Sequence, residues 1–266
     1  MSLLQIVVLA LVQGITEFLP ISSYGHLVVA SDLAGWPDQT LKFDIALHVG
    51  TLAAVVVYFW RDLWLIGSAL IRPRRRGAKP GRRLGLHLLL ATLPVLLAGG
   101  LVHGYVPETF LRDPLVIALA TIVFGALLYG ADRYGLRVRR LEHMTLGAAL
   151  FIGFAQAIAL IPGTSRAGIT MTAARLLGFE RAASARFSML LAIPTIIAAG
   201  ALAARDLYQL GDLTVTREAA LAAALSFVVA LISIWGLLKW LERMSFTPFV
   251  VYRLLMGGAL LVWLLA

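Results

Sequence analysis

The sequence contains two short polar segments that interrupt long apolar stretches and resemble each other. The first runs from Gln13 to His26 and reads QGITEFLPISSYGH, and the second runs from Gln156 to Thr170 and reads QAIALIPGTSRAGIT. Both follow the plan Gln, small residue, apolar stretch, Pro, any residue, Ser or Thr, Ser, and then Gly. The two glutamines are 143 residues apart and the two prolines 142. One such break in each half of a chain is typical of a membrane site built from two repeats.

Further matches at the same interval support an internal duplication. Phe43 is matched by Phe187, and the tripeptide Arg61–Leu63 (RDL) is repeated, each after 144 residues. We therefore expect a single integral membrane domain with repeat one over about 1–131 and repeat two over about 144–266.

The composition excludes an ordinary soluble domain. Hydrophobic residues make up 60% of the chain and charged residues 14%, with a mean hydropathy of +0.88, so a polytopic α-helical membrane protein is expected. The absence of cysteine excludes disulfides and thiol catalysis. Residues 1–11 lack the pattern of a cleaved signal peptide, and we expect them to be retained. Apolar stretches of near-spanning length cover 43–60, 84–103, 114–131, 187–204, 219–238 and 248–266.

The distribution of charge predicts the topology. The net charge of +9 could suggest nucleic-acid binding, but seven of the basic residues lie in the segment 72–83. We interpret this segment as a cytoplasmic loop beside anionic headgroups, and we expect no nucleic-acid partner. If each polar segment is a re-entrant helical hairpin, every basic-rich loop lies on the cytoplasmic side. Each half then has one hairpin plus three transmembrane helices, and this odd number inverts the second repeat.

The hairpin tips should meet near the middle of the bilayer, because non-helical backbone there must be enclosed by protein or line a cavity. Glu17 shares a helix face with Gln13, and a charge at this depth costs about 2.5–3.5 kcal/mol and usually has a function. Arg166 lies among glycines and hydroxyls, which suits an oxyanion because guanidinium offers a two-pronged donor. The structural alternatives are a carboxylate that anchors the hairpin and an arginine that caps its own helix.

A compact Ser-Ser-x-x-His cluster follows Glu17. We expect Ser23 to attack phosphorus with His26, three residues on, as its proton partner, and the reverse assignment with His26 as nucleophile stays open. His48, inside an apolar stretch, is interpreted as structural. The catalytic set is then Glu17, Ser23, His26 and Arg166. The expected substrate-binding residues are Gln13, Ser22, Gly163, Thr164, Ser165, Gly168 and Thr170.

These motifs together closely resemble the bacterial undecaprenyl-diphosphate phosphatase family, the bacitracin-resistance proteins. The resemblance covers essentially the full length, with departures at Tyr24, where the family has a small hydroxyl residue, and at Ala167, where it has Ser. It rests on Gln13 with Glu17, Pro20–His26, Phe43 with Asp44, and Pro162–Gly168.

The resemblance implies hydrolysis of undecaprenyl diphosphate to undecaprenyl phosphate and inorganic phosphate, which recycles the lipid carrier of cell-wall synthesis and confers bacitracin resistance. It also implies a divalent cation, Mg²⁺ or Ca²⁺, which Glu17 could hold. The expected location is the bacterial inner membrane, with the active site open to the periplasm. The sequence leaves open whether the chain forms a homodimer and whether it also moves its product across the bilayer.

A transporter or lipid flippase is the main alternative, since inverted repeats with broken helices are typical of transporters. A carrier would use Arg166 and the hydroxyls but has little need of Glu17 beside Ser23 and His26. A structural or assembly protein would explain neither buried ion.

Overall fold

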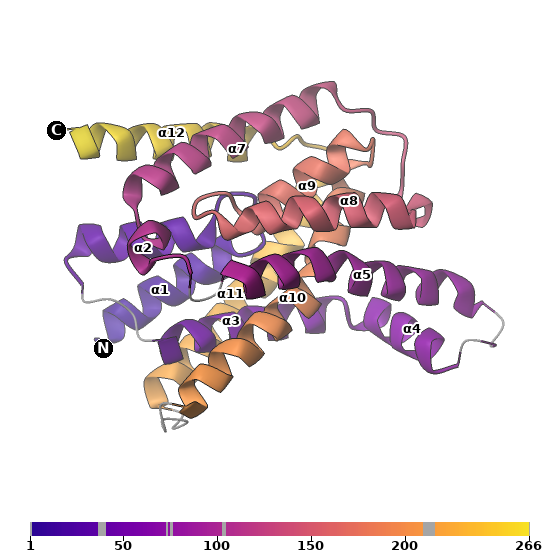
Figure 1. The fold of residues 1–266 in the computed structure, drawn as a ribbon, viewed down its shortest axis with the longest axis horizontal. Helices are drawn as coiled ribbons and strands as arrows, with labels where there is room; N and C mark the ends of the chain where they lie inside the picture. The colour runs from indigo at the N-terminus through magenta and orange to yellow at the C-terminus, as the bar shows by residue number, and fades with distance from the viewer. Residues whose placement is uncertain are drawn as a thin grey trace.

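The computed structural model describes residues 2–36, 41–72, 74, 77–102, 105–209 and 216–265, and within these ranges the regular structure is helical. Figure 1 shows long helices running side by side along the length of the molecule. The helices are α1 (Leu3–Thr16), α2 (Ser23–Ala34), α3 (Leu41–Tyr58), α4 (Trp60–Ile71), α5 (Ala78–Val102), α6 (Glu108–Leu111), α7 (Pro114–Tyr134), η1 (Leu141–His143), α8 (Leu146–Ala157), η2 (Ile158–Leu160), α9 (Arg166–Leu176), α10 (Arg181–Gln209), α11 (Arg217–Leu241) and α12 (Thr247–Leu265).

The two polar segments form two helical hairpins, α1–α2 and α8–α9, as predicted. Their tips share an unusual backbone: Ser22 and Ser165 are the only non-glycine residues with positive φ in the described ranges, at 73° and 70°. The next residues, Ser23 and Arg166, begin the returning helices. The backbone thus pairs Ser22 with Ser165, whereas the shared Pro, any residue, Ser or Thr, Ser plan of the sequences sets Ser23 opposite Ser165, and the structure corrects that match by one residue. Because the left-handed turn fixes the register, the counterpart of Ser23 is Arg166.

Each hairpin packs against a helix of the other half. Helix α1 contacts α2 and α11, whereas α8 contacts α9 and α5. In Figure 1 the α1–α2 hairpin reaches inward from the end that holds both chain termini, and α8–α9 from the opposite end. The two halves are thus packed together through their hairpins, while the duplication and the inversion of the repeats across a membrane stay predictions.

The predicted apolar stretches coincide largely with α3, α5, α7, α10, α11 and α12. The stretch 43–60 runs past the end of α3 at Tyr58 to the first residue of α4, and His103 and Ala266 lie outside the described residues. In the described part of the chain, five helices are long and apolar enough to cross a membrane, namely α5, α7, α10, α11 and α12. A sixth span is obtained if α3 and α4, which are bent by 78° at their junction, count as one. The chain is therefore a multi-pass α-helical membrane protein.

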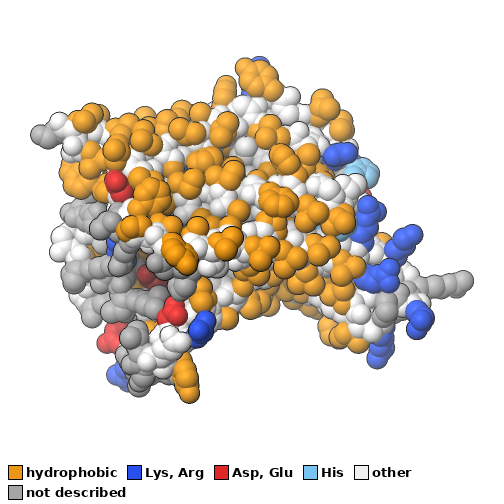
Figure 2. Space-filling view, in the orientation of Figure 1, with side chains coloured by type: hydrophobic (Ala, Val, Ile, Leu, Met, Phe, Trp, Pro, Cys, Tyr) orange, Lys and Arg blue, Asp and Glu red, His pale blue; other side chains and the backbone are white. Residues whose placement is uncertain are grey.

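Basic side chains gather at one end of the molecule. Figure 2 shows a broad hydrophobic surface along the middle, with most visible Lys and Arg side chains at the end formed by α4 and α5. Helix α5 begins at Ala78, so the last part of the predicted basic loop over 72–83 is helical. Pro73, Arg75 and Arg76 lie outside the described residues. The exposed cations among the described residues of the segment 72–83 are Arg72, Arg74, Lys79, Arg82 and Arg83.

A buried arginine of α12 joins the two hairpin tips. Arg253 is fully buried, and its Nη2 donates to the carbonyl oxygens of Gly163 and Thr164, each at 3.0 Å. Its Nη1 donates to the Pro20 carbonyl at 3.3 Å, and its Nε to the Thr121 carbonyl of α7 at 3.0 Å. One side chain thus binds three carbonyls of the two tips, where turns leave backbone groups without helical partners, together with the Thr121 carbonyl of α7.

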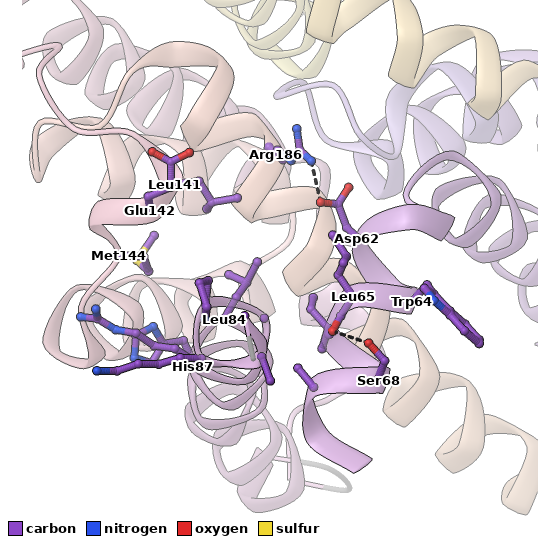
Figure 3. Close-up of a pocket in the computed structure, with 18 residues that line it drawn as sticks. Asp62, Trp64, Leu65, Ser68, Leu84, His87, Leu141, Glu142, Met144 and Arg186 are labelled. Carbon is purple, nitrogen blue, oxygen red and sulfur yellow. Dashed lines mark hydrogen bonds and ion pairs between the residues drawn. The ribbon is translucent and has the colours of Figure 1, made fainter. Parts of the chain in front are cut away.

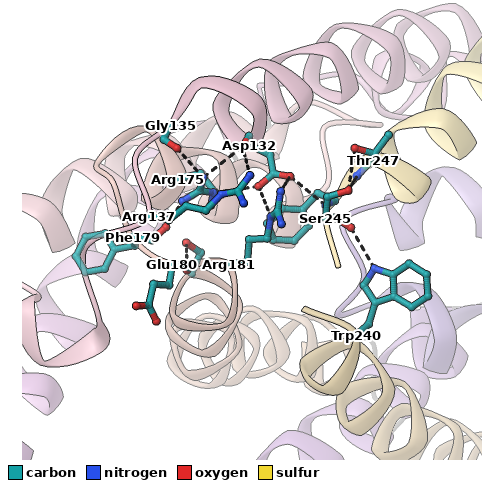
Figure 4. Close-up of polar contacts among 12 residues, drawn as sticks. Asp132, Gly135, Arg137, Arg175, Phe179, Glu180, Arg181, Trp240, Ser245 and Thr247 are labelled. Carbon is teal, nitrogen blue, oxygen red and sulfur yellow. Dashed lines mark hydrogen bonds and ion pairs between the residues drawn. The ribbon is translucent and has the colours of Figure 1, made fainter. Parts of the chain in front are cut away.

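A second buried ionic cluster lies near the basic end (Figure 4). Asp132 of α7 accepts from Arg181 Nε at 2.7 Å and from Arg175 Nε at 3.2 Å, and its other oxygen accepts from the Phe246 backbone N–H at 3.2 Å. Arg175 also donates to the backbone carbonyl of Phe179. This cluster connects α7, α9, α10 and the segment before α12, and it fixes the end of the second hairpin that lies away from its tip.

Candidate active site

Glu17 lies at the tip of the first hairpin and is the centre of the candidate site. Its backbone N–H donates to the Gln13 carbonyl at 3.0 Å, which continues the helical hydrogen bonding of α1 by one residue. The residue is only 8% exposed. Its Oε2 accepts from Gln13 Nε2 at 3.0 Å and from Ser23 Oγ at 2.8 Å. Its Oε1 accepts from Arg166 Nη2 at 3.1 Å. The structure therefore brings four of the predicted residues into one hydrogen-bonded cluster.

Arg166 comes from the second hairpin, where it is the first residue of α9. The helix start is fixed by Ser165, whose Oγ accepts from the Gly168 backbone N–H at 3.1 Å. Nη2 of Arg166 is paired with Glu17, while its Nη1 is buried and has no hydrogen-bond partner among the described residues. Because a buried N–H without a partner is costly, this nitrogen is well suited to an anionic ligand.

Ser23 and His26, predicted to act as a pair, have different hydrogen-bond partners in the structure, and the Ser23 hydroxyl donates to Glu17. His26 Nδ1 lies 2.6 Å from the Ser22 carbonyl oxygen, and its Nε2 lies 2.6 Å from the Tyr252 hydroxyl. The imidazole also stacks on the Tyr252 ring, with centroids 5.5 Å apart. Ser23 opens α2 and turns back toward Glu17, whereas the ring of His26 turns toward α12. A catalytic role for His26 stays a prediction.

His48, which the sequence analysis interpreted as structural, lies in the site. Its Nε2 is 3.9 Å from Glu17 Oε2, and its Nδ1 is 2.8 Å from the Asp44 carbonyl oxygen. A small cavity of about 60 Å³ opens beside it, lined by Ser23, Tyr24, Leu27, Val28, Asp44, His48 and Arg112. This volume is far below the ~300–1,000 Å³ of typical small-molecule sites. A diphosphate can enter only if side chains at the mouth move.

Most of the predicted substrate-binding residues of the second hairpin have structural contacts. Gly163 has φ +85°, and a side chain there would collide with the Ile117 carbonyl, so only glycine fits this turn. Thr170 Oγ1 lies 2.7 Å from Ser188 Oγ in the core. Thr164 is fully buried, and its hydroxyl has no hydrogen-bond partner among the described residues. Substrate contacts by these residues stay predictions.

The two departures from the family pattern differ in position. Tyr24 is 39% exposed and lines the small cavity, so it can change the shape of the mouth. Ala167 is buried in the hydrophobic core, where a serine hydroxyl would need a partner. Only Tyr24 is therefore placed to affect a ligand.

A divalent cation can be accommodated only together with substrate oxygens. The described residues include no group of three or more His, Asp and Glu side chains able to hold a metal. Glu17 Oε1 accepts one hydrogen bond within the described structure and keeps a lone pair. Mg²⁺ commonly binds through one or two carboxylates, water and substrate phosphates, and the Glu17 carboxylate fits this mode.

Comparison with known proteins places the chain in a family. The family model described as "Bacitracin resistance protein BacA" matches residues 6–259. The chain belongs to this family. It is 50% identical to a protein named undecaprenyl-diphosphatase from Chromohalobacter salexigens over 264 residues, covering 99% of each chain.

Two further relatives agree in name and extent. A protein named undecaprenyl-diphosphatase from Alcanivorax borkumensis is 48% identical over 265 residues, which covers 99% of this chain and 100% of the relative. One of the same name from Hahella chejuensis is 49% identical over 265 residues, covering 99% of both. The match thus includes both hairpins and Arg253, a residue the sequence analysis missed although a lone charge in the apolar stretch 248–266 is the same signal that pointed to Glu17.

Proposed function

We propose that this chain is an undecaprenyl-diphosphate phosphatase, which hydrolyses its lipid substrate to undecaprenyl phosphate and inorganic phosphate. Family membership and full-length relatives with that name support the activity. The structural observation that carries the proposal is the cluster of Glu17, Ser23 and Arg166, in which a hydroxyl, a carboxylate and a guanidinium are joined by two hydrogen bonds. By regenerating the lipid carrier, the reaction supports cell-wall synthesis and bacitracin resistance.

In the first step Ser23 Oγ attacks the terminal phosphorus of the diphosphate. Its proton passes to Glu17 Oε2, which already accepts the Ser23 hydrogen bond at 2.8 Å. The bond from phosphorus to the bridging oxygen breaks, and undecaprenyl phosphate leaves with that electron pair and takes the proton from Glu17. The product on the protein is a phosphoserine, and Glu17 is again a carboxylate.

In the second step water attacks the phosphoserine. Glu17 accepts a proton from the water as the new bond to phosphorus forms, and the departing Ser23 oxygen takes that proton back. Inorganic phosphate is released and the starting state is restored. The same carboxylate serves both steps because one oxygen faces the attacked serine.

Arg166 stabilises negative charge during both steps. Its Nη1 is buried and directed to no described acceptor, so it can donate to a phosphoryl oxygen while Nη2 holds Glu17 in place. The guanidinium and an oriented carboxylate act in apolar surroundings, where electrostatic stabilisation is strong. Glu17 would hold a divalent cation, which would supply further neutralisation of the diphosphate charge.

His26 as nucleophile is the rival assignment. Both of its ring nitrogens are occupied, by the Ser22 carbonyl and the Tyr252 hydroxyl, so attack from His26 requires one of these bonds to break. Ser23 needs no such change. We therefore assign His26 to positioning the start of α2, and His48 to the electrostatics of Glu17.

The site is expected to open to the periplasmic side of the bacterial inner membrane, because the basic end of the molecule is the expected cytoplasmic end. In that orientation the undecaprenyl chain of the substrate remains in the bilayer, while only its diphosphate headgroup enters the site. The experiment that tests the function is phosphate release from undecaprenyl diphosphate by purified protein and by its Glu17→Ala variant. Turnover by the wild type and none by the variant supports hydrolysis. Substrate transport by proteoliposomes without phosphate release would favour the carrier.

A further inference from the structure

A second, larger cavity lies at the basic end of the molecule. It has a volume of about 760 Å³ and is formed by α4, the start of α5, η1 and the start of α10, and we refer to it as the α4–α5 cleft (Figure 3). None of the residues of the candidate active site lines it. Its size falls within the range of small-molecule sites, so its lining shows what it can bind.

One wall of the cleft carries two cations and a histidine. Lys79, Arg83 and His87 line it, and their spacing of four residues places them on one face of α5. Lys79 and Arg83 are exposed and form no ion pair with any described residue. His87 is only 7% exposed, and its Nδ1 is buried with no hydrogen-bond partner in the described part of the chain. A buried imidazole nitrogen of this kind is expected to meet a ligand or water.

The rest of the polar lining adds one cation and two acids. Arg186 Nη2 lies 2.5 Å from Asp62 Oδ1, so these two charges balance each other. Glu142 of η1 is exposed, and in Figure 3 it lies on the same side of the cleft as Met144 and His87, across from Asp62. With Lys79 and Arg83 unpaired, the cleft keeps a positive excess next to a buried nitrogen. This combination suits a phosphate group.

The rest of the lining is apolar. Trp64 is 71% exposed and Leu65 is 61% exposed, and both line the cleft together with Ile66, Ala69, Leu84, Leu141 and Met144. Exposed Trp is typical of the boundary between headgroups and acyl chains. A free phosphate ion has no use for this surface, whereas a lipid uses both the cations and the apolar wall.

We propose that the α4–α5 cleft binds an anionic phospholipid. The phosphate lies against Lys79, Arg83 and His87, and an acyl chain lies on Trp64 and Leu65. The site is separate from the proposed catalytic cluster, so the proposal does not depend on which residue is the nucleophile. A lipid held here joins α4, which is bent away from α3 by 78°, to α5 and α10.

The test measures binding of dioctanoyl phosphatidic acid to purified protein in a neutral detergent. The double variant Lys79→Gln/Arg83→Gln should bind it at least about 10-fold more weakly, because two charge-assisted hydrogen bonds are lost. Arg82→Gln is the matched control, since it removes an exposed charge from the same helix turn at a position outside the cleft, and it should change the affinity less than about two-fold. Phosphatase activity and thermal unfolding of the variants should match the wild type.

Two further ligands distinguish the source of the phosphate. Dioctanoyl phosphatidylcholine should bind at least about 10-fold more weakly than phosphatidic acid, and inorganic phosphate should not compete at millimolar concentration. The proposal is overturned if the double variant binds like the wild type, if Arg82→Gln loses as much affinity, if phosphatidylcholine binds equally, or if inorganic phosphate displaces the lipid. If the double variant unfolds, Arg83→Gln alone provides the same comparison.

Discussion

Arg166 Nη2 lies 3.1 Å from Glu17 Oε1, although 149 residues separate them in the sequence. Each ion comes from a different hairpin, and each would be expensive to bury in a membrane without a partner. Their pairing requires both tips to be in place at the same time. The ion pair is therefore both a condition of folding and the core of the proposed catalytic site.

Glu17→Gln is expected to lower kcat at least about 100-fold while the protein stays folded, because the amide cannot accept the Ser23 proton. Phosphate release under saturating substrate measures the effect, and thermal unfolding checks the fold. Glu242→Gln, the same change at an exposed side chain paired with Lys239, should leave kcat within about two-fold. Retention of more than a tenth of wild-type activity by Glu17→Gln would contradict the role as base.

Arg166→Lys is expected to be almost as damaging as Arg166→Ala. A lysine keeps the charge but cannot hold Glu17 and present a second N–H to phosphate at the same time. The measurement is kcat and KM of both variants. Wild-type kinetics of the Lys variant at saturating substrate would show that only the charge matters. Arg243→Lys, at an exposed position, is the control.

The nucleophile can be identified by trapping the phosphorylated protein. Rapid acid quench with substrate labelled at the terminal phosphate should yield an acid-stable adduct on Ser23, which Ser23→Ala eliminates. His26→Gln should still form the adduct, because the Ser23 hydroxyl donates to Glu17, whereas His26 Nε2 contacts Tyr252. An acid-labile adduct that persists in Ser23→Ala would identify His26 instead.

Arg253→Met is expected to destabilise the protein by at least about 2 kcal/mol, because it removes the side chain that donates to the buried carbonyls of Pro20 and Thr164. Thermal unfolding in detergent should show a lower midpoint, together with loss of activity. The unfolding midpoint of Arg253→Lys should lie between those of the wild type and Arg253→Met, since an ammonium reaches fewer of these carbonyls. The exposed Arg243→Met serves as control, and equal stability of the two Met variants would refute the role of Arg253.

The expected topology can be tested in this cysteine-free chain by thiol labelling. Arg74 precedes α5 and Tyr105 follows it, and both are exposed, so they lie at opposite ends of one span. With an impermeant reagent and a breached outer membrane, Tyr105→Cys should be labelled in intact cells and Arg74→Cys only after lysis. The reverse pattern would place the proposed active site on the cytoplasmic side.

The helical architecture was predictable because apolar stretches of spanning length leave few alternatives in a bilayer. Two hairpins were predictable because Pro and Gly break the stretches at matching intervals. The structural pairing of Ser22 with Ser165, one residue away from the match of the sequences, was not predictable. It depends on which residue of each tip takes positive φ. Ser22 does so in one tip and Ser165 in the other, and neither is the glycine that such a backbone favours.

The candidate site was predictable only in part. Glu17 and Arg166 were found because charges in apolar sequence are costly, whereas His48 and Tyr252 were missed because each carries little charge signal and its neighbours come from distant helices. The hydrogen-bond partners of Ser23 and His26 could not be predicted, because helical spacing says which face a residue occupies but not which rotamer it takes, and a catalytic pairing of the two stays a prediction. The Ser23 hydroxyl donates to the Glu17 carboxylate, and His26 Nε2 contacts the Tyr252 hydroxyl of α12.

The shared turn at Ser22 and Ser165 carries different chemistry in the two halves. Ser23 follows one turn and Arg166 the other, and the residue of the second half that corresponds to Glu17 is the apolar Leu160. A symmetric pair built from two first halves would bring two carboxylates together and no guanidinium. A pair of second halves would hold two guanidiniums and neither an acid nor Ser23. Only unlike halves joined together give a charge-balanced centre, so separating or exchanging them should abolish the site even if each half keeps its fold.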